Sequence, residues 1–276
     1  LVQLLDDILE HNIAEMQEVY DFLLASPVDC VTRSNNNKRN GFISAFNTFF
    51  IAQQPDTLHS RNVIGIVEGY DPKLKNEYIL IGAHYDHLGA AAINRNGESE
   101  NMVFPGADDN ASGVATVLEV AKMVSSGHFM FRRSVIFAFF GSNELGMAGS
   151  WYFLNRSFGE VENIVAMINL DMVGRSGRDN SIQVFVAGLN REMTDIANKL
   201  SGRALSIAPS YTPTDYFPSD HRLFYEKGIP VALFTSGVHR DYHTVRDTPD
   251  KLDYKQMEQL AEYVFAMAEV ISNRPD

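Results

Sequence analysis

The sequence predicts a single three-layer α/β/α domain, with a mixed, mostly parallel central sheet flanked by helices. Short apolar runs rich in β-branched residues alternate along the chain with segments whose apolar residues recur at helical spacing. This alternation is typical of strand–helix–strand units that build a parallel sheet. The chain has 276 residues, 45% of them hydrophobic, so it can bury a large core. No linker-like segment divides it, and we expect one domain over residues 1–276.

The first elements lead up to a polar segment. Residues 1–25 carry apolar residues at helical spacing among acidic ones, which predicts an amphipathic helix that covers the core. Apolar runs over 62–68 and 77–84 predict two strands, and the second run is nearly all apolar, as expected of a central strand. Residues 90–105 are polar, and we expect them to form a loop at the rim of an active site.

Strands and helices continue to alternate after this loop. Further strands are expected over 133–140, 164–170, 181–186 and 230–234. Further helices are expected over 113–126, 147–155, 190–200, 221–227 and 254–271. In open sheets of this kind, sites form at the carboxyl ends of the strands.

Composition excludes several classes of partner. The net charge of -12 and the pI near 5.1 argue against nucleic acid and against anionic membranes. The single cysteine, Cys30, excludes an internal disulfide and any zinc site built from several thiolates, so His, Asp and Glu must hold any metal. We expect no membrane insertion, because no apolar run approaches the roughly 20 residues that a spanning helix needs. Motifs of phosphate loops, dinucleotide folds, HExxH zinc sites and serine elbows do not occur.

Seven side chains of metal-ligand type follow the expected strands or lie in the loop after the last one: His84, Asp86, Asp108, Asp109, Glu144, Asp171 and His243. In the turn PGADDNASG, residues 105–113, Asp108 or Asp109 offers a short carboxylate able to bridge two cations. Acidic residues also cap helix N-termini, which is an alternative role for any one carboxylate but leaves the histidines unexplained. Two imidazoles favour zinc or another borderline metal over a calcium or structural site.

Six motifs occur in order between residues 62 and 254: GAHYDHLG, GADDNASG, NELGMAGS, NLDMVGR, SDHRLFYEKGIP and DYHTVRDTPD. Together they resemble the dizinc aminopeptidases of the bacterial leucyl aminopeptidase type. The wider superfamily includes glutaminyl cyclases, glutamate carboxypeptidase and the transferrin receptor ectodomain. The resemblance implies a zinc-peptidase-like domain, a peptide substrate and a secreted or periplasmic location, although the chain shows no signal segment. Protein partners are not indicated.

The resemblance also implies a role for each ligand-type residue. His84 and Asp171 resemble ligands of one zinc ion, and Glu144 and His243 resemble ligands of a second. Asp109 resembles the carboxylate that bridges the two ions. Two zinc ions bridged by Asp109 would lower the pKa of a shared water and polarise the carbonyl of a scissile bond.

Other residues near these motifs have less direct roles. Asp86 resembles the family carboxylate that orients a ligand imidazole through its other nitrogen. The family motifs place no ligand at His87 or Asp108, so we expect surface or supporting roles for both. Candidates for substrate contact are Asp220, His221 and Tyr242. Helix capping is the alternative for the first two, and packing is the alternative for the tyrosine.

Asn143 departs from the family pattern, in which a glutamate at this position serves as general base. An amide orients a water but does not accept its proton at ordinary pH, and loss of a general base costs about 10²- to 10⁴-fold in rate. Two classes of function therefore stay open. One is a metallo-exopeptidase that releases N-terminal residues, and the other is a zinc-binding peptide or protein recognition module without chemistry. Glutaminyl cyclisation, which uses one zinc ion and a carboxylate acid/base, is a third hypothesis. The absence of a carboxylate at Asn143 weakens it as much as it weakens the exopeptidase hypothesis.

Overall fold

The computed structural model describes residues 60–95, 98–175, 182–186, 191–201, 210–211 and 217–275. All of these residues except Ser60 belong to one compact unit, Arg61–Asp276. The helix expected over 1–25 lies outside the described residues, so the expectation of one domain over the whole chain stays a prediction. Within the described part, no helix is both long enough and apolar enough to cross a membrane.

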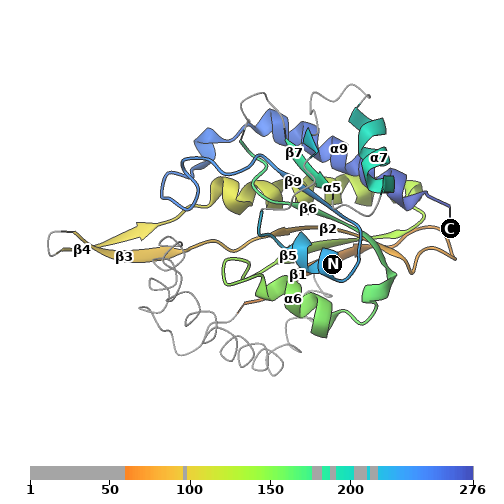
Figure 1. The fold of residues 1–276 in the computed structure, drawn as a ribbon, viewed down its shortest axis with the longest axis horizontal. Helices are drawn as coiled ribbons and strands as arrows, with labels where there is room; N and C mark the ends of the chain where they lie inside the picture. Colours follow the sequence, from red (N-terminus) through yellow and green to blue (C-terminus); the bar gives the residue numbers. More distant parts are fainter. Residues whose placement is uncertain are drawn as a thin grey trace. The chain divides into compact units, whose positions relative to one another are not determined.

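A seven-stranded sheet forms the centre of this unit (Figure 1). In spatial order its strands are β1 (Val63–Val67), β5 (Ser134–Phe140), β2 (Tyr78–His84), β6 (Ile164–Leu170), β9 (Val231–Thr235), β7 (Gln183–Val186) and β8 (Ser210–Tyr211). Strands β5, β2, β6 and β9 pair in parallel, whereas β1 and β7 run antiparallel to β5 and β9. The expected mixed, mostly parallel sheet is confirmed, and β8 is a short strand that its sequence did not indicate.

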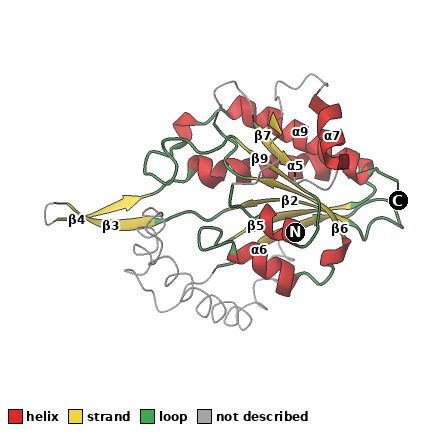
Figure 2. Cartoon of the chain, viewed as in Figure 1, coloured by secondary structure: helices red, strands yellow, loops and turns green. Residues whose placement is uncertain are grey.

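Helices cover both faces of the sheet, which gives three layers (Figure 2). The α-helices are α5 (Gly113–Ser126), α6 (Ala148–Tyr152), α7 (Arg191–Ser201), α8 (His221–Glu226) and α9 (Tyr254–Ser272). Single turns of other helix types are η1 (Ala107–Ser112), η2 (His128–Met130), η3 (Phe153–Ser157), η4 (Val161–Asn163) and η5 (Pro249–Lys251). Ile79 and Ile81 of β2 pack in one core with α5, α7 and α9. Leu80 packs in a second core with η3 and α8, because successive side chains of a strand point to opposite faces.

Residues 90–105, expected to be a loop, contain a β-hairpin instead. Strand β3 (Ala90–Arg95) pairs antiparallel with β4 (Glu98–Val103) in a separate two-stranded sheet. In Figure 1 the hairpin extends away from the end of the main sheet at which β2 terminates. The sequence between the two strands reads Asn-Gly, a strong short-range hairpin signal that outweighs the polar character of the flanking residues.

Candidate metal centre

Ligand-type side chains meet at the carboxyl edge of the parallel strands. His84 is the last residue of β2, and Asp171 directly follows β6. Glu144 lies shortly after β5, Asp109 lies in η1 just before α5, and His243 lies in the loop after β9. Because β5, β2, β6 and β9 are parallel neighbours, their carboxyl ends bring together segments that are far apart in the sequence.

These residues form two groups that share one carboxylate. In the first group, His84 Nε2 lies 3.4 Å from Asp109 Oδ1 and 3.5 Å from Asp171 Oδ1. In the second, His243 Nε2 lies 3.0 Å from Asp109 Oδ2 and 3.4 Å from Glu144 Oε2. The two oxygens of Asp109 therefore face different groups, which is the arrangement of a bridging carboxylate.

His87 also joins the second group, although the sequence motif did not indicate it. Its Nδ1 lies 2.9 Å from Glu144 Oε1 and 3.6 Å from Asp109 Oδ2. Its ring meets the ring of His243 edge-on, with centroids 5.6 Å apart. The only sequence signal for this placement is that His87 lies three residues after the end of β2, the strand that carries His84. The sequence prediction followed the family motif, which has no ligand at this position.

The donor set fits borderline cations such as zinc. Asp109 Oδ2 and Asp171 Oδ1 are buried and accept no hydrogen bond from the described residues. Burial opposes a charge on His84, yet the Asp171 and Asp109 carboxylates hold its pKa well above the ordinary value. Against a similar burial effect, Asp109 and Glu144 raise the pKa of His243 to about 9. The carboxylates thus favour positive charge on the two imidazoles, which protons supply when no metal is bound. Imidazole and carboxylate are also zinc ligands, so a zinc ion can take the place of those protons.

The turn that carries Asp109 is fixed by buried hydrogen bonds. Asp247 Oδ2 accepts from the backbone N–H groups of Asp108 and Asp109, at 2.9 and 3.0 Å. The Asp108 carboxylate accepts from the backbone N–H of Gly174 at 2.6 Å and lies 3.0 Å from His239 Nε2. Asp108 is therefore directed away from both ligand groups, and its role is to join the turn to the loop that carries His243.

Asp86 was expected to orient the His84 imidazole, and it also contacts the backbone of the Glu144 segment. His84 Nδ1 lies 3.1 Å from the Asp86 carbonyl oxygen and 3.6 Å from its carboxylate. The carboxylate accepts from the backbone N–H groups of Asn143 and Glu144, at 2.9 and 3.1 Å. Asp86 thus positions the Glu144 segment at least as directly as it positions the His84 imidazole.

Asn143 is half-buried and belongs to a polar network with Asp220 and Ser150. Its Nδ2 donates to Asp220 Oδ2 at 3.0 Å, and Ser150 Oγ lies 2.5 Å from Asp220 Oδ1. Burial raises the pKa of Asp220 to about 6, and its carboxyl group has no solvent exposure. Because a carboxylate oxygen accepts the hydrogen bond, the amide nitrogen of Asn143 faces Asp220 and its oxygen is the group left for other partners.

The remaining substrate-contact candidates differ in their surroundings. The Tyr242 ring stacks on the His243 ring with centroids 3.7 Å apart, beside the second group. Burial and the nearby Asp109 and Glu144 carboxylates raise the pKa of Tyr242. His221 is fully buried and meets Phe185 edge-on, so its burial, like that of Asp220, favours a supporting role over substrate contact.

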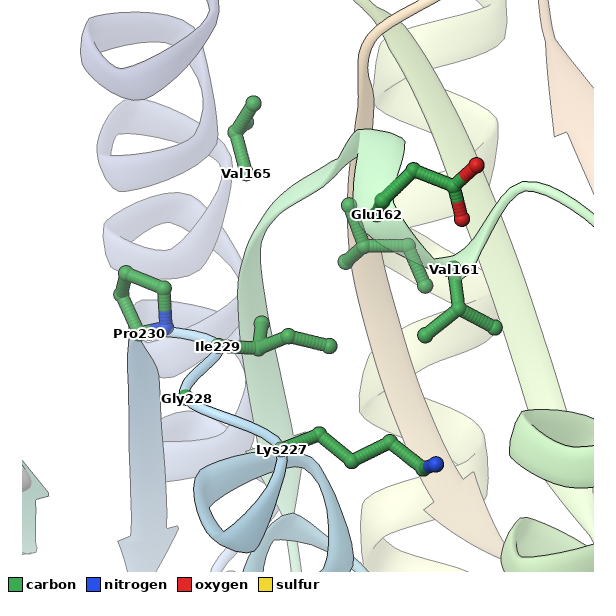
Figure 3. A pocket seen from close by; sticks show the side chains of 8 residues that line it. Val161, Glu162, Val165, Lys227, Gly228, Ile229 and Pro230 are labelled. Carbon is green, nitrogen blue, oxygen red and sulfur yellow. The ribbon is translucent and has the colours of Figure 1, made fainter.

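A surface hollow of about 620 Å³ lies at the other end of the strands (Figure 3). It is lined by Val161, Glu162, Ile164, Val165, Lys227, Gly228, Ile229 and Pro230. These residues precede or begin β6 and β9, whereas the ligand groups follow the ends of the strands. The hollow is therefore separate from the metal centre, and its lining offers no ligand cluster.

Comparison with known proteins finds similar proteins that are named as aminopeptidases. The chain is 29% identical over 215 residues to the aminopeptidase YwaD of Bacillus subtilis, which covers 75% of this chain and 44% of that protein. The zinc aminopeptidase BSAP from Bacillus subtilis matches with a TM-score of 0.60 and 27% identity, over 76% of this chain and 49% of that one. The aminopeptidase from Aneurinibacillus sp. strain AM-1 matches with a TM-score of 0.59 and 31% identity, over 78% and 48%.

This chain spans about half the length of these relatives. The model of one family, described as peptidase family M28, matches residues 62–268, which contain both ligand groups. The resemblance to the zinc aminopeptidases noted from the motifs is thereby confirmed at the level of the family. The chain belongs to peptidase family M28.

Proposed function

We propose that this chain is a zinc-dependent exopeptidase that releases N-terminal residues from peptides. The observation that carries the proposal is the pair of ligand groups joined by the two oxygens of Asp109. The family membership supports a peptide substrate, and relatives named as aminopeptidases support release of N-terminal residues.

Each group would hold one ion. His84, Asp109 and Asp171 would bind the first, and Asp109, Glu144 and His243 the second. When bound, two zinc ions polarise a carbonyl group and lower the pKa of a coordinated water. The chain fixes this arrangement through Asp86, whose carboxylate holds the backbone of Glu144 in place.

Asn143 limits the rate in this proposal. Its amide nitrogen is engaged by Asp220, so its oxygen is available to accept a hydrogen bond from a water or from a substrate N–H. An amide oxygen orients such a group but does not take up its proton, so we expect hydrolysis about 10²- to 10⁴-fold slower than with a carboxylate base.

The test uses the zinc-loaded chain with aminoacyl nitroanilides and short peptides, analysed by mass spectrometry. We expect slow release of single N-terminal residues, and no cleavage of the same peptides after N-acetylation. Turnover on N-acetylated peptides would indicate an endopeptidase and contradict the proposal. The absence of turnover both in the wild-type chain and in Asn143→Glu would refute it.

A second function is favoured by Asn143 itself: a zinc-binding module that recognises peptides without cleaving them. In that case the wild-type chain binds peptides with a free N-terminus, and Asn143→Glu produces no peptidase activity. Peptides with an N-terminal glutamine serve as a further probe, because loss of ammonia without chain cleavage would instead identify a glutaminyl cyclase-like activity.

A further inference from the structure

His87 is the fourth member of the second ligand group, beside Asp109, Glu144 and His243. Its side chain is 9% exposed, and its Nδ1 faces both Glu144 Oε1 and Asp109 Oδ2. A residue that only donated a hydrogen bond to Glu144 would not need to face Asp109 as well. His87 Nδ1 and His243 Nε2 thus approach the same two carboxylates.

The separations match those of one ligand shell. Zinc bonds to nitrogen and oxygen of about 2.0–2.1 Å in a tetrahedron place the ligand atoms about 3.3 Å from one another. The contacts of His87 with Glu144 and Asp109 are 2.9 and 3.6 Å. Those of His243 with Asp109 and Glu144 are 3.0 and 3.4 Å. Both histidines lie near the same oxygen of Asp109, Oδ2, but they face different oxygens of Glu144, Oε1 and Oε2. One ligand atom from each of the four residues lies within 4.8 Å of the others.

The surroundings of His87 fit the same role. Gly106 begins the turn that carries Asp109, and a Cβ atom added there would lie 2.7 Å from the His87 ring. The missing side chain therefore makes room for the imidazole. His87 Nε2 is buried and has no hydrogen-bond partner among the described residues, so the polar contacts that orient the ring are those of Nδ1.

We infer that His87 is a fourth protein ligand of the second zinc ion, together with Asp109, Glu144 and His243. This inference deepens the proposed function and rests on its metal centre. The first ion would have His84, Asp109 and Asp171 as its protein ligands.

The test compares the wild-type chain with His87→Gln and His87→Ala. The glutamine amide keeps a hydrogen-bond donor for Glu144 but is a poor zinc ligand, so it separates the two roles. His128→Gln is the matched control, because His128 is an exposed histidine outside both groups. Zinc stoichiometry and affinity are measured by competition with a chelating dye, and the number of imidazoles around zinc by X-ray absorption spectroscopy.

We expect two zinc ions in the wild-type chain, with three imidazoles shared between them. Loss of a residue that merely supports a ligand costs about 10- to 100-fold in metal affinity. His87→Gln and His87→Ala should therefore weaken one ion by more than about 100-fold and remove one imidazole from the spectrum, while His128→Gln changes neither.

Two zinc ions with only two imidazoles in the wild-type chain would overturn the assignment of His87 and leave the proposed function intact. An unchanged imidazole number in His87→Gln would do the same, whatever the change in affinity. Fewer than two bound zinc ions would overturn the two-ion centre and this inference with it. Peptidase activity is not needed for any of these readings.

Discussion

The substitution Asn143→Glu tests whether the chain lacks only a general base. It places a carboxylate at the position where an amide now donates to Asp220. If the rest of the centre is intact, general-base help should raise the rate of peptide hydrolysis by about 10²- to 10⁴-fold. The expected gain depends on the protonation state of the new side chain, which its neighbour controls.

Asp220 Oδ2 lies 3.0 Å from the Asn143 amide nitrogen, so the substitution brings two carboxyl groups to about that separation. At an effective dielectric constant of about 20, two negative charges about 3 Å apart repel by about 5 kcal/mol, or about 4 pKa units. The pair therefore holds one proton at neutral pH. Burial already raises the pKa of Asp220 to about 6, which favours the form of the pair in which Asp220 holds this proton and the introduced glutamate is ionised.

The assay measures kcat on aminoacyl nitroanilides across the neutral pH range, with zinc content determined for each variant. Asn143→Gln is the control, because it has the length of glutamate without its charge. We expect a large increase in kcat for Asn143→Glu and none for Asn143→Gln. Equal increases in both variants, or no increase in a fully zinc-loaded Asn143→Glu, would show that the missing carboxylate is not what limits the rate.

Three further predictions concern the metal centre and its support. Chelation of zinc should lower the melting temperature and abolish activity, and zinc should restore both, because the carboxylates lose their compensating charge; an unchanged melting temperature would contradict a bound ion. Gly106→Ala should weaken zinc binding and cost about 1–2 kcal/mol in urea unfolding, because its φ is +63° and the new Cβ would lie 2.6 Å from the Asp109 carbonyl oxygen; unchanged zinc affinity would contradict this. Asp220 has a raised pKa in the folded state, so wild-type stability should fall as pH rises from about 4 to about 6, by at most about 3 kcal/mol. When both proteins are free of zinc, this fall should be absent in Asp220→Asn. Urea unfolding measures the free energy of unfolding at each pH, and an equal fall in both proteins would contradict the prediction.

Most strands and helices of the described unit could be predicted from the sequence, because each is a local pattern. The helix 113–126 and the strand 164–170 have the predicted bounds. The hairpin Ala90–Val103 was missed, because polar side chains on a separate sheet give no apolar alternation. The antiparallel directions of β1 and β7 depend on pairing between distant segments, which local periodicity does not encode.

The contacts that support the ligand-type residues also join segments far apart in the sequence, so local patterns do not predict them. Asp247 and His239 lie far along the chain from the turn that they fix, and no spacing rule links them to it. Asp220 and Asn143 are also distant in sequence, so no local pattern indicates the amide–carboxyl pair that they form. These contacts form only when loops at the ends of separate strands converge.

The sequence by itself determined the chemical types present: histidines and carboxylates after apolar strands, a single cysteine, and an asparagine, Asn143, next to the ligand-type Glu144. It determined these because residue identity fixes donor atoms and charge. Only the tertiary structure decided which oxygen of Asp109 faces which group, that Asp108 turns away, and that His87 reaches Glu144 and Asp109. Such geometry depends on backbone directions and on the space beside residues such as Gly106, and these arise only when the sheet edge and its loops pack together.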